Sequence, residues 1–185
     1  FSFASWNLIG HCGNIFRDQG SAVLLNLRFG PIINASFGIA NQLAAQTNQL
    51  AIALLGAFSP EIISCEGRGD RSGMLLLAHR VCKYGTILTL FFTIPMIIEM
   101  DYILHLWLGD PPEYTAYLCQ FLLVALLLDR LSGGYMLALI AGGRIAGYQA
   151  TLGTLLILTP LLGWLIFNLG APPFGIGIAY IFMMG

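Results

Sequence analysis

A charge-free stretch of the sequence, residues 29–50, carries side-chain amides at helical spacing. The amides are Asn34, Asn41, Gln42, Gln46, Asn48 and Gln49. The asparagines recur every seven residues, which is about two helical turns, and the glutamines follow a neighbouring row. Amides donate and accept hydrogen bonds but do not titrate, so they suit a ligand rich in hydroxyls and carbonyls, such as a sugar, better than a proton relay.

The composition predicts that these amides lie in an integral membrane protein. Of 185 residues, 57% are hydrophobic and 9% are charged, and the mean hydropathy is +0.80. A soluble domain has about 25% charged residues, so a soluble fold of this length could not cover its surface. The net charge of −1 gives no basic surface that would indicate a nucleic acid as partner.

Long apolar runs predict an all-α integral membrane protein, a multi-span helical bundle forming a single membrane domain over residues 1–185. We expect about six transmembrane helices, at residues 1–16, 31–58, 74–98, 114–140, 145–167 and 174–185. The runs are continuous and lack the alternation of barrel strands. Both ends of the chain lie inside apolar runs, which predicts a fragment of a longer protein with a truncated last span.

Lys and Arg near the span ends predict the orientation. Positive residues gather in 59–83 and 129–144 and are missing from 99–113 and 168–173. We therefore expect the first two segments on the cytoplasmic side and the other two outside. A connector at 17–28 would then also lie outside, although its two arginines depart from the pattern.

In a bilayer, an amide stripe along residues 31–58 must face protein or a water-filled cavity, because hydrocarbon offers amides no partner. One interpretation is interhelical hydrogen bonding, which contributes only about 0.6 kcal/mol per bond on average. The other is a hydrated substrate cavity. Six amides exceed what helix packing requires, so we favour the cavity.

Charged residues near the stripe are further candidates for the site. Arg28 and Lys83 could hold an anionic group such as a phosphate, or could instead extend to the membrane interface, as we expect for Arg80. Asp129, which adjoins Arg130, is the acid that lies well inside an apolar stretch, so it is a candidate coupling acid.

Four scattered cysteines, Cys12, Cys65, Cys82 and Cys119, form no CxxC pair. We therefore expect neither a metal site nor a disulfide framework. We expect no cofactor, although transport could draw on an H+ or Na+ gradient.

A series of motifs carries a family resemblance over about residues 6–150. It comprises Asn26, Phe29-Gly30, Asn34-Ala35, Gly38-Ile39-Ala40, Gln42, Ser59-Pro60-Glu61-Ile62, Gly67, Gly69-Asp70, Lys83, Pro95, Leu106-Trp107-Leu108-Gly109, Pro111, Tyr114-Thr115, Ala141-Gly142-Gly143-Arg144-Ile145 and Tyr148-Gln149. The series resembles the polysaccharide (O-antigen type) flippases of bacterial inner membranes. They belong to the superfamily that also holds the multidrug and toxin extrusion (MATE) antiporters and the lipid II flippases.

The resemblance implies one six-helix lobe of a two-lobe MATE-type transporter in the bacterial inner (plasma) membrane. Such a protein flips an undecaprenyl-diphosphate-linked oligosaccharide for surface polysaccharide biosynthesis by alternating access, and it is not an enzyme. Its partners would be the lipid-linked oligosaccharide, the bilayer, and a polysaccharide polymerase with its chain-length machinery. The alternatives are a cation-coupled multidrug or toxin exporter of the same superfamily, and a non-transporting membrane assembly subunit.

Overall fold

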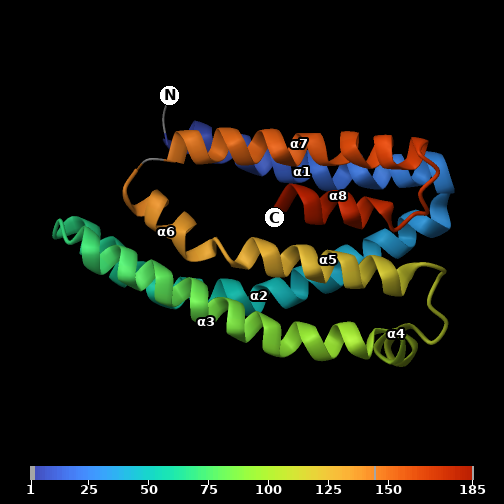
Figure 1. Cartoon of the computed structure of the whole chain (residues 1–185), viewed down its shortest axis with the longest axis horizontal. Coiled ribbons are helices and arrows are strands. Elements are labelled where there is room, and N and C mark those ends of the chain that lie inside the picture. The colour runs from blue at the N-terminus through green and yellow to red at the C-terminus, as the bar shows by residue number, and fades with distance from the viewer. Residues whose placement is uncertain (1–2, 144, 185) are drawn as a thin grey trace.

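The computed structural model of the chain describes residues 3–143 and 145–184, and within them all regular secondary structure is helical (Figure 1). The helices are α1 (Phe3–Phe29), α2 (Pro31–Gly67), α3 (Arg71–Ile98), α4 (Met100–Leu108), α5 (Thr115–Arg130), α6 (Gly133–Ala141), α7 (Ile145–Asn168) and α8 (Gly175–Met184). The predicted all-α class is therefore confirmed.

The predicted connector at 17–28 is wrong, because α1 runs without interruption to Phe29. Arg17 and Asp18 lie in the middle of this helix and form an ion pair. The two adjacent charged residues predicted a loop. A helix tolerates such residues when they neutralise each other and contact a further partner. The chain turns only at Gly30, whose positive φ of 90° a residue with a side chain rarely adopts, and Pro31 then starts α2.

The other predicted loops are also shorter than expected. The segment 59–73 is helical up to Gly67, and the turn there comprises only residues 68–70. The segment 99–113 contains α4, because Met100 and Leu104 supply one buried apolar face at a spacing of four residues. The predicted span 114–140 is divided into α5 and α6 next to Asp129 and Arg130.

Within the described ranges, two helices are long and apolar enough to cross a membrane, Arg71–Ile98 and Ala146–Asn168. The number rises to four if each of two bent pairs forms one span, Pro31–Ala53 with Gly56–Gly67 and Thr115–Arg130 with Gly133–Ala141. Each pair is bent by 45°. Large apolar side chains cover the outer face of α3, among them Ile87, Phe91 and Ile98. An outward apolar face of this kind is typical of a helix that meets lipid.

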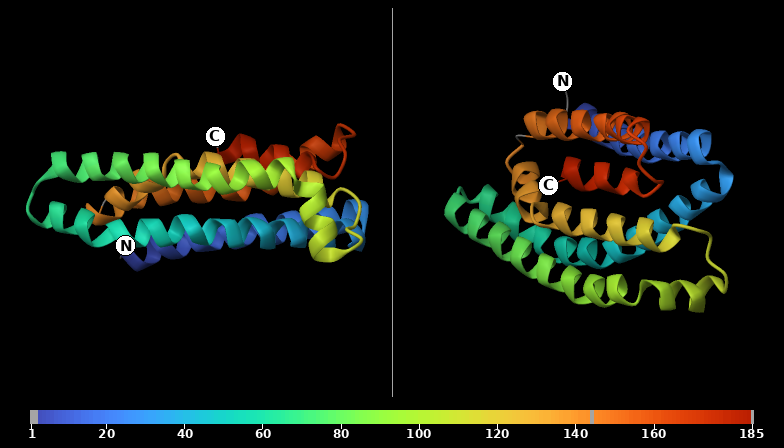
Figure 2. Two further views of the ribbon diagram at one scale, coloured as in Figure 1. Left: turned by 90° about the horizontal axis from the view of Figure 1, so that it is seen from below. Right: turned by 45° about the vertical axis from the view of Figure 1, so that its right-hand side comes forward.

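The helices run back and forth along one axis (Figure 1). The turns at 68–70 and 142–143 lie at one end, and Gly30, the segment 109–114 and the segment 169–174 lie at the other. Figure 2 shows α2 and α3 side by side, with α4 turned across the far end.

A layer formed by α1 and α7 faces a layer formed by α2, α3 and α5, and α8 lies between the two (Figures 1 and 2). The main apolar core joins these layers and includes Leu25, Phe37, Leu118 and Ile176. A smaller core joins α2, α3 and α6 around Ile62, Ala78 and Val81. Several buried hydroxyls bond within their own helix; Thr89 Oγ1, for example, donates to the Gly85 carbonyl at 2.8 Å.

Candidate functional site

A cavity of about 640 Å³ lies between the two layers. This volume falls in the range of small-molecule sites, about 300–1,000 Å³. Its polar lining comes from Asn14, Arg17 and Asp18 of α1, Asn41, Gln42 and Asn48 of α2, Asp129 and Arg130 of α5, Tyr148 of α7 and Tyr180 of α8. The apolar lining includes Leu122, Leu126 and Leu156. The cavity therefore combines hydrogen-bonding groups from five helices with an apolar wall.

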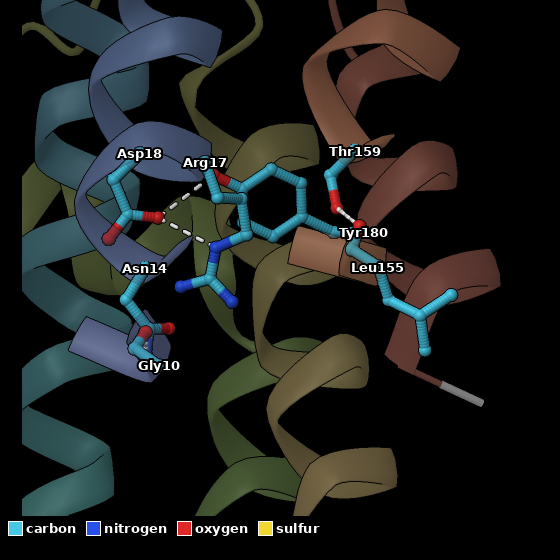
Figure 3. A network of polar contacts seen from close by, with 7 residues as sticks. All are labelled: Gly10, Asn14, Arg17, Asp18, Leu155, Thr159 and Tyr180. Atoms are coloured by element: carbon cyan, nitrogen blue, oxygen red, sulfur yellow. Dashed lines mark hydrogen bonds and ion pairs between the residues drawn. The ribbon is translucent and has the colours of Figure 1, made fainter. Parts of the chain in front are cut away.

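One charged pair of the cavity is anchored between two helices (Figure 3). Arg17 Nε donates to Asp18 Oδ1 at 2.8 Å, and the Tyr180 hydroxyl donates to the same oxygen at 3.0 Å. The Arg17 guanidinium carbon also lies 4.9 Å from the centre of the Tyr180 ring, within the distance of a cation–π contact. Tyr180 thus contacts both charged side chains and connects α1 to α8.

The second charged pair lies within one helix. Arg130 contacts the carboxylate of Asp129 through Nη2, and its side chain is 14% exposed. Its Nε atom is buried and has no hydrogen-bond partner among the described residues. Asn48 Oδ1, which belongs to another residue of the cavity wall, is likewise buried and unpartnered within that part of the chain. Such groups are uncommon in folded proteins, which makes these two atoms candidate contacts for a ligand or water.

The structure separates the predicted amide stripe into two rows. Asn34, Asn41 and Asn48 are half-buried, whereas Gln42, Gln46 and Gln49 are exposed. Positions offset by one residue point about 100° apart on a helix, so the two rows cannot share one narrow face. Asn41, Gln42 and Asn48 reach the cavity wall, while Asn34, Gln46 and Gln49 are not part of it.

Of the predicted charged candidates, the structure brings Asp129 to the cavity. Arg28 and Lys83 do not line it, because both side chains are exposed, on α1 and α3 respectively. The cations that do line it are Arg17 and Arg130. Arg17 was placed in a loop, and Arg130 was treated only as the neighbour of Asp129.

Sequence reasoning also missed Asn14, Asp18 and Tyr180 as lining residues. A signal was present, because residues 3–29 contain no proline, and Asn14 and Arg17 are three residues apart. That spacing places them on one face of a continuous helix. Tyr180 gave no comparable signal, because it lies in a charge-free apolar run.

No protein-family profile matches the sequence, and no curated protein or solved structure is significantly similar to it. Among the described residues, no group of three or more His, Cys, Asp or Glu lies together so as to hold a metal ion. The chemistry of the site therefore has to be argued from the cavity itself.

The cavity offers binding groups, and its charges balance. Arg17 and Arg130 supply two positive charges, and Asp18 and Asp129 supply two negative ones. Each arginine is already paired with the adjacent aspartate. Amides, tyrosine hydroxyls and aromatic faces complete the wall, a combination that suits a polar ligand with several hydroxyl groups.

Proposed function

We propose that this chain is part of a membrane transporter that moves a lipid-linked oligosaccharide across the bacterial inner membrane. The observation that carries the proposal is the cavity between α1, α2, α5, α7 and α8, with polar groups from every one of these helices. Ionisable residues inside membrane helices are costly and usually face a substrate pathway. Here four ionisable residues line one cavity, and two of them, Asp129 and Arg130, lie in a bent helix pair that could form one span.

The exposed glutamines of α2 fit the same proposal. Gln46 and Gln49 are exposed and do not line the cavity, although the helix is predominantly apolar. Lipid would leave these amides without partners. We infer that this face of α2 meets water or further protein, as it would in a two-lobe transporter with six spans in each lobe and a central pathway.

A second candidate function is a cation-coupled exporter of drugs or toxins. It requires a carboxylate in the cavity, and the structure provides two, Asp18 and Asp129. Both are paired with arginine, which favours a structural role for these acids over reversible ion binding. The amides and tyrosines of the wall suit a ligand rich in hydroxyls, so we prefer the oligosaccharide proposal.

The test replaces the amides of the cavity wall. The double substitution Asn41→Leu plus Asn48→Leu should abolish export of the glycan at the cell surface while leaving the abundance of the protein in the membrane unchanged. A matched control is Gln19→Leu plus Asn26→Leu, which removes two exposed amides of α1 that do not line the cavity. The control should export normally.

Two results would reject the proposal. Normal export by the Asn41 and Asn48 variant would show that the cavity is not the pathway. Loss of abundance in parallel with export would instead support a role of the amides in helix assembly. Efflux of tetraphenylphosphonium that depends on Asp129 would favour the drug exporter.

A further inference from the structure

The cavity wall contains an unused acceptor and an unused donor. Asn48 Oδ1 can only accept a hydrogen bond, and Arg130 Nε–H can only donate one. Both atoms are buried, neither has a partner among residues 3–143 and 145–184, and both side chains line the cavity. A bound group that donates to one and accepts from the other would satisfy the pair. Hydroxyl groups do both, so a sugar, which carries several hydroxyls, has the required chemistry.

The Nε–H group of Arg130 is free to donate a hydrogen bond, but the positive charge of Arg130 is not available to an anionic ligand. Its Nη2 atom is engaged by the Asp129 carboxylate, which neutralises the guanidinium. An anion placed here would meet Asp129, and a cation would meet Arg130. The free Nε–H still donates a hydrogen bond, so the site favours a ligand that is polar and uncharged.

The other charged pair of the cavity wall has partners within the protein. Asp18 accepts from both Arg17 and Tyr180, and the Tyr180 ring lies against the Arg17 guanidinium. Along α2, Asn41 and Asn48 are separated by about 10 Å, since each residue advances the helix by about 1.5 Å. Asn41 and Asn48 therefore belong to different parts of the cavity wall.

We propose that Asn48 and Arg130 form a subsite for an uncharged, polyhydroxylated ligand, namely a neutral sugar unit. The inference rests on the proposed function and adds the class of sugar that this cavity accepts. Tyr148, on the facing helix α7, also lines the cavity and supplies an aromatic face of the kind on which sugar rings stack. Because the charge of Asp129 neutralises that of Arg130, the subsite binds neutral sugars in preference to acidic ones.

The experiment measures equilibrium binding of radiolabelled maltose and of maltobionate, its carboxylate counterpart, to the purified full-length protein in lipid nanodiscs. Maltose should bind more tightly than maltobionate. Asn48→Leu removes the acceptor, and Arg130→Lys removes the Nε–H donor while keeping a cation beside Asp129. Each should weaken maltose binding by about tenfold, the order of one lost hydrogen bond in a buried site.

Matched controls remove the same groups away from the cavity. Gln49→Leu deletes an exposed amide of α2, and Arg80→Lys changes an exposed arginine of α3. Both should bind maltose like the unmodified protein. A thermal unfolding curve for each variant separates loss of binding from loss of folding.

Several outcomes would overturn the subsite. Tighter binding of maltobionate than of maltose would show that the cavity selects anions. Unchanged maltose binding by folded Arg130→Lys protein, or no maltose binding by the unmodified protein, would show that the buried atoms are satisfied by water only. Suppose that one of these binding results is obtained while the Asn41→Leu plus Asn48→Leu variant loses glycan export. The subsite proposal is then rejected and the transport proposal stands. Normal export by that variant rejects the transport proposal itself.

Discussion

Two Arg–Asp pairs face the same cavity, and they differ in what else they contact. Arg17 and Asp18 on α1 are held by Tyr180 of α8, which bonds the carboxylate and lies over the guanidinium. Asp129 and Arg130 are neighbours on α5, next to the bend into α6, and Arg130 Nε is left without a partner in the described chain. The first pair connects two helices, whereas the second contacts the cavity with a free donor.

This difference indicates a division of roles. A charged pair that a tyrosine of another helix contacts contributes to the arrangement of the helices. A charged pair with an unused donor is available for a ligand. We therefore expect substitutions at the first pair to lower stability and substitutions at the second pair to lower transport.

The largest effect on stability is expected for Arg17→Leu. It leaves the Asp18 carboxylate uncompensated and removes the contact with Tyr180, so the free energy of unfolding should fall by about 3 kcal/mol, the lower end of the range for a broken buried pair. Asp18 is 38% exposed, which is why we take the lower end. Thermal unfolding in nanodiscs measures the loss. If Arg130→Leu is equally destabilising, the proposed division between the pairs is wrong.

A smaller loss is expected for Tyr180→Phe, which deletes the hydroxyl bound to Asp18 but keeps the ring over Arg17. A hydrogen bond to a charged group contributes about 1.5 kcal/mol or more, so the free energy of unfolding should fall by about this amount. Tyr117→Phe is the matched control, because this tyrosine is exposed. Equal unfolding temperatures of the two variants would show that the hydroxyl does not connect α1 to α8.

Arg130→Lys should hardly change stability, because a cation remains beside Asp129. The change in unfolding free energy should stay within about 0.5 kcal/mol, as for a substitution that breaks no structural contact. Glycan export should nevertheless be slower. If this variant exports glycan as fast as the unmodified protein, the proposed difference in function between the two pairs is wrong.

The smallest effect is expected far from the cavity, at Asp70, the N-cap of α3. The backbone N–H of Gly73 at 2.9 Å and the hydroxyl of Ser72 at 2.8 Å lower the pKa of this carboxyl below its ordinary value. Its contribution to stability is complete above the unfolded pKa of about 4 and is lost as the pH falls through the lower folded pKa. Asp70→Ala should therefore slightly lower the unfolding temperature at pH 7, and the difference should vanish in acid. A difference that grows in acid would contradict the lowered pKa.

The sequence was sufficient to predict the all-α class and most of the long helices. Apolar runs and Pro31 indicate the start of α2 within a residue, and the length of the α7 run indicates a membrane helix. The connector at 17–28 was predicted wrongly because local charge resembles a loop. What keeps Arg17 and Asp18 in a helix is Tyr180, a contact over 162 residues that no local pattern reveals.

The amide stripe was a partial guide to the site. Helical spacing identified α2 as the helix that carries the amides, and Asn41 and Asn48 do reach the cavity. Spacing could not show which of the two rows faces inward, because that depends on how α2 rotates against α1 and α5. It also could not show that Arg28 and Lys83 lie outside the cavity, since their surroundings are set by the packing of other helices.

Water access to Asn48 tests the central claim most directly. In a protein whose four cysteines have been replaced, Asn48→Cys in native membranes should react with a water-soluble, charged thiol reagent. Ile87→Cys, on the outer apolar face of α3, should be protected by lipid. Labelling of Asn48→Cys with protection of Ile87→Cys is the result that a hydrated cavity inside a membrane bundle predicts. Protection of Asn48→Cys to the same degree as Ile87→Cys would contradict it.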